Sequence, residues 1–304
     1  MPAFFRRALL CALLVSAAWS AEPAVDFFQL TDTHLVNLDG IPPRLSASLQ
    51  EKRDSARHLT VALQHLPTSP APAFVLITGD LTDAYCYAGP SGQEVSGPRD
   101  TLRAIFDHSP VPIVPTLGNH DLTRYKAPLG NAKPKADQSV AADARRAWTR
   151  FPQFHDGTYY AYRQAVGNTT FVFLILDDGD GFGNNRDFQA GEVAWLKSQL
   201  AEHAGEPMIL AMHIPIEGAD FWPAAKPMLA RYPNVVLSIA GHKHTDGIDQ
   251  VDLGTRSLPQ IRTAALFISE RNARHFRLRE DRIEVFATGK PEELVKTIQL
   301  AGQH

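Results

Sequence analysis

The sequence predicts an α/β sandwich, and two observations support this fold class. Six apolar runs rich in β-branched and aromatic residues alternate with amphipathic stretches, which is the pattern of an α/β protein. Nearer the C-terminus, three further runs follow one another with short connections, a pattern typical of antiparallel strands. We therefore expect one sheet covered by helices and a second, more antiparallel sheet packed against it.

The expected elements follow in order along the chain. Strands buried on both faces are expected at 25–31, 73–78, 111–117, 170–176, 207–212 and 234–240. Apolar residues recur at helical spacing among charged ones in two stretches, which predicts helices at 45–66 and 191–203. The late runs 259–268, 273–279 and 282–288 are expected to form a meander, with Glu280-Asp281 as one turn.

Three segments do not fit helices or strands. Residues 84–99 are rich in Gly, Pro and Ser, residues 122–140 are polar, and residues 178–190 contain several glycines. Each follows the end of an expected strand, where binding residues often lie. They are candidates for loops that contact a substrate, and plain surface loops are the alternative.

The first 21 residues have the features of a signal peptide. Arg6 and Arg7 precede an apolar run, and small residues follow that run. The run is shorter than the ~20 residues of a spanning helix, so we favour secretion or export to the periplasm over an N-terminal membrane anchor. We expect residues 22–304 to form a single domain, because no repeat or long linker divides them.

The charge of the chain argues against nucleic acid and anionic lipid as partners, and its cysteine content argues against an internal disulfide. Removal of the signal segment takes away two arginines and moves the formal charge from −3 to −5, which gives no general attraction to nucleic acid polymers or anionic lipid. No other stretch is apolar enough for stable membrane insertion. Cys11 lies in the signal segment, so Cys86 remains alone and cannot form an internal disulfide.

Residue types that bind metals follow five of the expected strands. Open α/β sheets place their ligand sites at the carboxyl ends of strands, so these side chains are expected to meet. The candidate metal ligands are Asp32, His34, Asp80, Asn119, His213, His242 and His244. The set offers oxygen and imidazole nitrogen but no thiolate, which suits Mn, Fe or Zn, and Co or Ni as well.

This set suits two divalent metal ions and phosphate chemistry. Asp32 and His34 are placed to chelate one ion, and the two oxygens of Asp80 can bridge two ions. Two divalent cations against two carboxylates leave a positive site that attracts a phosphoryl group and makes hydroxide from a bridging water near neutral pH. Such a hydroxide would attack phosphorus in line.

The tetrapeptide Gly118-Asn119-His120-Asp121 adds two candidate catalytic residues. His120 lies beside the Asn ligand and is placed to stabilise or protonate the leaving oxygen of the ester. Asp121 is expected to orient the imidazole of His120.

These motifs resemble those of the calcineurin-like metallophosphoesterase family. The ordered set is Asp32-x-His34, Gly79-Asp80, Gly118-Asn119-His120-Asp121, His213 and Gly241-His242-x-His244, and the resemblance spans roughly residues 26–246. The stretches around Asp32 and Asp80 look closest to the class III cyclic-nucleotide phosphodiesterase branch.

The resemblance implies a fold, two ligand sets and a catalytic residue. The fold is the metallo-dependent phosphatase fold, a four-layer αββα sandwich of two mixed β-sheets flanked by helices. One metal would be held by Asp32, His34, Asp80 and His244, and the other by Asp80, Asn119, His213 and His242, with Asp80 bridging. His120 would be the catalytic histidine.

The sequence leaves several functions open within this chemistry. Purple acid phosphatases carry a tyrosine three residues after the bridging Asp, where this chain has Asp83, so a tyrosinate-bound ferric centre is not expected. Phosphodiesters are the favoured small-molecule substrates. A phosphomonoesterase of the acid phosphatase or nucleotidase kind is the alternative, and a non-catalytic metal- or phosphate-binding protein is a further one. The sequence does not predict the oligomeric state.

Other polar and aromatic groups have two interpretations each. Asp177-Asp178 are interpreted as a loop start or helix cap rather than further ligands, and Asp246 as a neighbour of His244 or a turn residue. The aromatic group Phe151 to Tyr162 is interpreted as core packing, with stacking against a substrate as the alternative.

Overall fold

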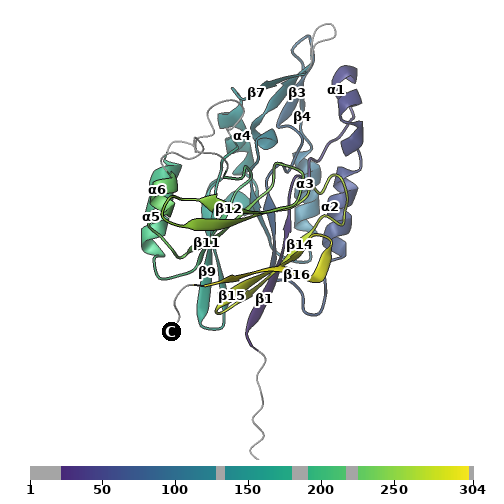
Figure 1. Cartoon of the computed structure of the whole chain (residues 1–304). Coiled ribbons are helices and arrows are strands. Elements are labelled where there is room, and N and C mark those ends of the chain that lie inside the picture. Colours follow the sequence, from purple (N-terminus) through teal and green to yellow (C-terminus); the bar gives the residue numbers. More distant parts are fainter. Residues whose placement is uncertain (1–21, 128–133, 180–190, 217–224, 301–304) are drawn as a thin grey trace, which may run out of the picture.

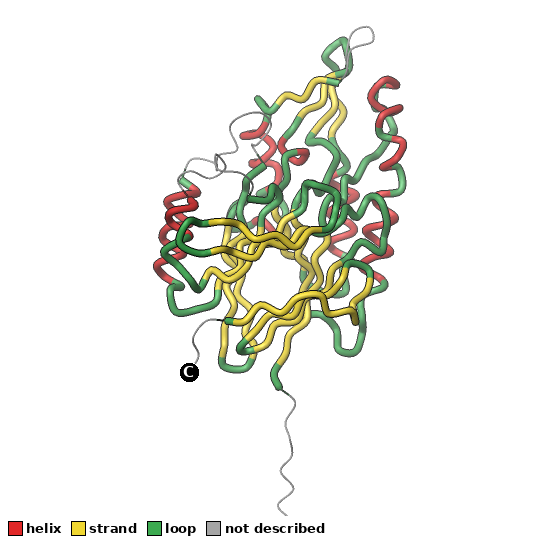
Figure 2. Tube along the Cα trace, viewed as in Figure 1, coloured by secondary structure: helices red, strands yellow, loops and turns green. Residues whose placement is uncertain are grey.

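Two six-stranded sheets form the centre of the protein, and a smaller four-stranded sheet lies at one end (Figures 1 and 2). The computed structural model describes residues 22–127, 134–179, 191–216 and 225–300. The expected signal peptide and most of the expected loop 178–190 lie outside the described residues. No helix in the described ranges is long and apolar enough to cross a membrane.

The first sheet has the strand order β16-β15-β14-β1-β2-β5. The strands β1, β2 and β5 run parallel, and β14 continues the sheet antiparallel to β1. The bounds are β1 Ala24–Leu30, β2 Phe74–Thr78, β5 Ile113–Thr116, β14 Arg274–Arg279, β15 Arg282–Ala287 and β16 Lys290–Gln299.

The second sheet has the strand order β12-β13-β11-β10-β9-β8. Its central strands β9, β10, β11 and β13 run parallel, while β8 and β12 pair antiparallel with their neighbours. The bounds are β8 Tyr160–Val166, β9 Thr169–Ile175, β10 Met208–Ala211, β11 Val235–Ala240, β12 Gly247–Asp252 and β13 Ser257–Arg262.

Helices cover the outer face of each large sheet (Figure 1). The bounds are α1 Pro43–Ser48, η1 Gln50–Lys52, α2 Ser55–Gln64, α3 Arg99–Asp107, η2 His120–Leu122, α4 Ala141–Trp148, η3 Pro152–Phe154, α5 Glu192–Glu202 and α6 Ala225–Leu229. Leucines and aromatics of α2, α3 and α4 share a core cluster with the first sheet, and α5 and α6 share another with the second sheet.

The two sheets pack against each other through a third apolar cluster. Phe27 lies in this layer, stacked between Phe74 and Phe276 and edge-on to Phe173, whereas the next residue, Phe28, faces the helices. Successive side chains of a strand point to opposite faces, so an uninterrupted apolar run fills both layers. The predicted four-layer αββα sandwich is confirmed.

The predicted helix 45–66 is wrong as a single element. The structure breaks it into α1, η1 and α2. Leu45 and Leu49 pack in a small cluster with Val36 and Ile41, whereas Leu59 and Leu63 pack against the first sheet. One straight helix cannot serve two apolar surfaces that face different ways, so the chain turns between them.

The expected late meander is only partly present. The Glu280-Asp281 turn between β14 and β15 is confirmed, but β13 pairs with β11 in the second sheet, while β14, β15 and β16 extend the first sheet. The meander is therefore not a separate sheet. Alternation within a strand shows which side chains are buried, but it does not show which strand lies alongside.

Two of the three expected loops also contain strands. The strands β3 Cys86–Ala88, β4 Glu94–Ser96, β6 Arg124–Lys126 and β7 Lys135–Asp137 form the small sheet in the order β4-β3-β6-β7. This small sheet lies beyond the carboxyl ends of β2 and β5 (Figure 1). It thereby places new side chains next to the motif residues.

Candidate metal centre

All seven candidate ligands lie at the carboxyl ends of strands in the two large sheets. They follow β1, β2, β5, β10 and β11. Five of them are buried, and His242 and His244 are partly exposed. Among the described residues, two groups built from these candidates have ligand atoms within 4.8 Å of one another: Asp32, His34, Asp80 and His244 form one, and Asp80, His213 and His242 form the other. Asp80 belongs to both, as a bridging carboxylate requires. A third such group joins the candidate His34 to Asp83 and His120.

The nitrogen atoms in each of the first two groups face one another at the spacing that a shared ion produces. Nε2 of His34 lies 3.3 Å from Nε2 of His244, and Nε2 of His213 lies 3.3 Å from Nδ1 of His242. Metal–nitrogen bonds of ~2.0–2.1 Å put two such nitrogens about 2.9–3.4 Å apart. Oδ2 of Asp80 lies 3.4 Å from His34 Nε2 and 3.1 Å from His213 Nε2, between the two groups.

Two buried oxygen atoms at the site lack a hydrogen bond among the described residues. They are Oδ1 of Asn119 and Oδ1 of Asp32. The latter lies 3.2 Å from Nε2 of His244, but this approach lacks hydrogen-bond geometry. A buried polar atom without a partner costs stability, so such atoms usually have a ligand. The donors and their arrangement therefore fit divalent metal ions.

Backbone strain is concentrated at the same residues. Every described non-glycine residue with positive φ is a candidate ligand: Asp32, His34, Asp80, His242 and His244, with φ between 43° and 68°. This left-handed region costs roughly 1–3 kcal/mol per residue and persists only where the surroundings enforce it. The strand ends are thus bent so that carboxylate and imidazole groups turn inward.

Glycines in the motifs allow the strand ends to approach closely. A Cβ on Gly79 would lie 2.7 Å from the His213 ring, and a Cβ on Gly118 would lie 2.3 Å from the backbone nitrogen of Asp80. No side chain fits in these positions without moving a candidate ligand. This explains why Gly precedes both Asp80 and Asn119 in the sequence.

Burial and the neighbouring carboxylates together shift the pKa values of the histidines in different directions. Burial lowers the pKa of His34 to about 4 and that of His242 to about 4, so both rings are neutral and have a nitrogen lone pair to offer. For His213, burial acts in the same direction, but the nearby Asp80 carboxylate outweighs it and raises the pKa to about 10. A bound cation would have to displace the His213 proton.

His120 lies beside the ligand cluster, held by Asp83. Its Nδ1 is 2.7 Å from the carbonyl oxygen of Asp83, so Nδ1 carries the proton and donates it to that oxygen. The hydroxyl of Tyr125 lies 3.3 Å from both ring nitrogens. The rings of His120 and His34 pack edge to face, with 4.6 Å between their centroids.

Asp121 does not contact the ring of His120 through any described hydrogen bond, so the prediction that it orients this ring is wrong. Its carboxylate accepts backbone N–H groups of Leu81, Thr82 and Gly118 at 2.8–3.0 Å. Burial, together with the nearby Asp80, raises the pKa of Asp121 to about 7. Asp121 therefore fastens the loop after β5 to the loop after β2.

The sequence did not predict the hydrogen-bond network around Asp83. The Asp83 carboxylate lies 3.3 Å from Nδ1 of His34 and 2.5 Å from Nζ of Lys52, and it accepts the Tyr87 hydroxyl at 3.0 Å. Burial opposes its ionisation, but His34 and the positive charges around it hold the pKa of Asp83 well below its usual range. The position of Asp83, three residues after Asp80, could have pointed to a role at the site, whereas nothing in the sequence marks Lys52 or Tyr87.

Further aspartates near the site have structural roles. Asp178 accepts the backbone N–H groups of His213 and Ile214, and Asp177 pairs with Arg145. Asp246 bonds Arg274, Thr288 and the backbone of Ala264. None of the three belongs to a ligand group found among the described residues. Phe151 and Phe154 are buried in the core, in agreement with the packing interpretation.

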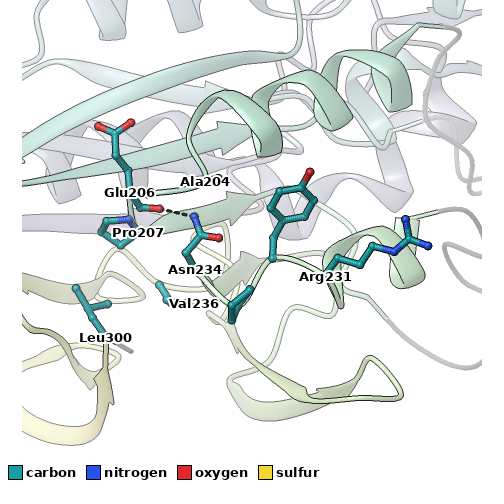
Figure 3. A pocket seen from close by; sticks show the side chains of 10 residues that line it. Ala204, Glu206, Pro207, Arg231, Asn234, Val236 and Leu300 are labelled. Carbon is teal, nitrogen blue, oxygen red and sulfur yellow. Dashed lines mark hydrogen bonds between the residues drawn. The ribbon is translucent and has the colours of Figure 1, made fainter. Parts of the chain in front are cut away.

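Two pockets differ in their relation to this site. One of about 200 Å³ is lined by His120, Asp83 and their neighbours. Another, of about 430 Å³, is lined by Glu206, Pro207 and Asn234, which precede β10 and β11 (Figure 3). The latter therefore lies at the ends of these strands opposite to His213 and His242, away from the ligand groups.

Comparisons with known proteins agree with this geometry. Residues 26–246 match the sequence model of the calcineurin-like phosphoesterase family. A dimetal phosphatase from Danio rerio has a similar structure, with a TM-score of 0.60 and 17% identity over 92% of this chain and 100% of that chain. A search of curated proteins finds no match.

Two weaker structural likenesses have TM-scores below 0.5. A purple acid phosphatase from yellow lupin seeds gives 0.48 with 12% identity, covering 91% of this chain and 53% of that chain. A 5′-nucleotidase precursor from Thermus thermophilus gives 0.44 with 14% identity, covering 91% and 54%.

Proposed function

Because the chain belongs to the calcineurin-like phosphoesterase family and is thus a metal-dependent hydrolase of phosphate esters, we propose that it cleaves small phosphodiesters outside the cytoplasm. The observation that supports catalysis here is the complete set of ligand-type side chains at one edge of the sheets, with His120 beside it. The preference for diesters rests on the resemblance around Asp32 and Asp80 to the cyclic-nucleotide branch. Export rests on the signal-like residues 1–21.

Each side chain of the centre has a proposed role. Asp32, His34, Asp80 and His244 would hold one divalent ion, and Asp80, Asn119, His213 and His242 would hold the other. When bound, such ions lower the pKa of water and neutralise charge on phosphoryl oxygens. The bent strand ends hold the ligand side chains in place before any ion or substrate arrives.

His120 is the proposed proton donor to the leaving oxygen. Since Nδ1–H is donated to the Asp83 carbonyl, Nε2 is the nitrogen available to the ester, and the imidazolium form carries a proton there. The carbonyl also fixes the ring orientation, so the proton is delivered from one position. Asp121 contributes indirectly, because it fixes the loop that holds Asn119 and His120.

The decisive assay uses the purified mature protein loaded with Mn or Zn. Bis-p-nitrophenyl phosphate and p-nitrophenyl phosphate should both be tested, and turnover of the diester should exceed that of the monoester. The opposite order would assign the chain to the phosphomonoesterases. Absence of metal-dependent turnover of either ester would contradict the enzyme assignment.

Two substitutions separate metal binding from proton donation. Asp80→Ala should remove activity together with bound metal, because this carboxylate lies between both groups. His120→Ala should lower kcat by roughly 10²–10⁴-fold, as loss of a general acid does, while metal content stays unchanged. Equal loss of metal in both variants would show that His120 is a ligand instead. Sequencing the N-terminus of the exported protein tests the predicted removal of residues 1–21.

A further inference from the structure

The pocket beside His120 has apolar walls and a charged floor. Leu45 and Leu49 come from the segment before α2, and Tyr87 and Tyr125 come from the small sheet. His120 and the Lys52–Asp83 ion pair also line it. The pocket therefore adjoins the group that would protonate the leaving oxygen.

The charges of this pocket are already paired. Nζ of Lys52 lies 2.5 Å from Oδ1 of Asp83, and the Tyr87 hydroxyl is donated to Oδ2 of the same carboxylate. Lys52 is the one cationic Lys or Arg among the described lining residues. Apart from His120, whose Nε2 proton goes to the leaving oxygen, an anionic guest would have only Lys52 to pair with and would compete for it with Asp83, and a buried carboxylate that loses its counterion is costly. The pocket thus disfavours negative charge.

The size of the pocket fits part of a substrate. Its volume is about 200 Å³, below the roughly 300–1,000 Å³ of pockets that hold a complete drug-sized ligand. If the phosphoryl group lies over the ligand groups, one compact organic substituent remains to be held. Leu45, Leu49 and Tyr87 belong to the same buried apolar cluster, so the wall is firm and apolar.

Resting on the proposed function, we infer that this pocket binds the leaving alcohol of the ester and selects a compact, uncharged, apolar or aromatic alcohol. In the reaction, water oxygen bonds to phosphorus and the bond from phosphorus to the alcohol oxygen breaks. That oxygen takes a proton from Nε2 of His120, and the water proton is released to solvent or recharges His120. Esters whose leaving group is anionic are poor substrates.

A matched substrate pair tests the charge preference. The 4-carbamoylphenyl and 4-carboxyphenyl esters have similar size and differ by one negative charge. They are prepared as methyl diesters or as monoesters, whichever class the enzyme hydrolyses. We expect kcat/KM to be about tenfold or more lower for the carboxylate, because a buried ion without a partner is strongly disfavoured. Equal values for the two esters would overturn the preference.

A matched variant pair tests the location. Leu49→Ala enlarges the pocket, whereas Ile41→Ala removes similar volume from the same cluster without lining the pocket. Leu49→Ala should raise the ratio of kcat/KM for 2-naphthyl esters to kcat/KM for phenyl esters roughly three- to tenfold, as expected for apolar pocket contacts. Ile41→Ala should leave that ratio unchanged. Because a ratio cancels general loss of folded or metal-loaded enzyme, partial destabilisation does not imitate the effect.

The outcomes distinguish this inference from the proposed function. The enzyme could hydrolyse the esters while Leu49→Ala leaves the kcat/KM ratio of 2-naphthyl to phenyl esters unchanged. That result would place the leaving alcohol elsewhere and leave the phosphoesterase assignment intact. Absence of hydrolysis of every ester would contradict the proposed function, and the leaving-group pocket with it. Quenching of protein fluorescence by 4-hydroxybenzamide, weakened in Leu49→Ala and absent with 4-hydroxybenzoate, supports the pocket independently of turnover.

Discussion

Nζ of Lys52 lies 2.5 Å from Oδ1 of Asp83, and the Asp83 side chain is buried while that of Lys52 is 11% exposed. Asp83 in turn lies 3.3 Å from Nδ1 of the candidate ligand His34 and accepts Nδ1–H of His120 at its carbonyl. The pair therefore links a segment before α2 to a candidate ligand and to the proposed proton donor. A cation outside the motifs thus helps to hold the metal centre in shape.

We predict that Lys52→Met weakens both folding and catalysis. It leaves the Asp83 carboxylate buried without its counterion, so the free energy of unfolding should fall by about 1–3 kcal/mol. The kcat/KM for the best ester should fall about tenfold, since His34 and His120 lose a fixed neighbour. Chemical denaturation and steady-state kinetics measure the two effects.

Arg53→Met is the matched control for Lys52→Met. Arg53 is the next residue, and its ion pair with Asp54 is more than half exposed on both sides, so its removal should change neither quantity measurably. Equal effects of the two substitutions would mean that Lys52 acts only as a surface charge.

Asn119→Ala should separate metal-dependent from intrinsic stability. Oδ1 of Asn119 is buried and accepts no hydrogen bond among the described residues, so in metal-free protein its loss should cost less than about 1 kcal/mol. Stabilisation by added Mn or Zn should shrink, because ligand binding to the folded state is what raises the melting temperature. Thermal melting with and without metal, together with metal analysis, measures this.

Asn272→Ala provides the contrast to Asn119→Ala. Nδ2 of Asn272 donates to the carbonyl oxygen of Ala265 at 2.8 Å, so this substitution should destabilise the protein by about 1 kcal/mol whether or not metal is present. If Asn119→Ala instead behaved like Asn272→Ala, Asn119 would have a purely structural role.

The positions of the candidate ligands could be predicted because each is joined to a strong local signal. A buried strand is visible in the sequence as an apolar run, and the residues just after the run lie at the carboxyl end of the strand. Asp80 and His213 could therefore be placed from their sequence neighbours alone. The same reasoning placed β14 and β15 with their turn. Local patterns therefore gave most of the sandwich and the group of seven candidate ligands.

The rest depended on contacts between distant residues. Lys52 and Asp83 are 31 residues apart, and Lys52 lies in η1, one of the pieces into which the predicted helix 45–66 is broken. The strands of the small sheet are three residues long, too short for alternation to be visible. Asp121 looked like a partner of His120 from adjacency, but an adjacent carboxylate can equally turn to backbone N–H groups, as it does here.

Asp26 should make stability depend on pH at the acidic end. Burial opposes its ionisation, but bonds from His275 and Arg277 at 2.9 and 2.7 Å prevail and lower its pKa to about 2. A carboxyl whose folded pKa is lowered stabilises the protein above its unfolded pKa, and this contribution is lost as pH falls toward the folded pKa. The affected window therefore runs from its ordinary value of 3.8 down to about 2.

Asp26→Asn tests this assignment. At pH 7 the substitution should lower the free energy of unfolding by about 1–3 kcal/mol, and the difference from the native protein should vanish as the pH approaches 2. Asp107→Asn, which removes a half-exposed pair with Arg103, should show little effect at any pH. A difference for Asp26→Asn that is constant from pH 7 to pH 2 would refute the ionic explanation. Urea titrations at several pH values provide the data.

Cys86 should be unreactive in the folded protein, and its chemistry also tests export. The thiol is buried in β3, and burial raises its pKa to about 11, so little thiolate exists at neutral pH. Labelling by a disulfide reagent should therefore be slow in native protein and complete in urea.

The number of thiols labelled in urea then counts cysteines: one per chain if residues 1–21 have been removed, and two if Cys11 is still present. Rapid labelling of the native protein would contradict the burial of Cys86, and two thiols in protein recovered from outside the cytoplasm would contradict cleavage of the signal segment.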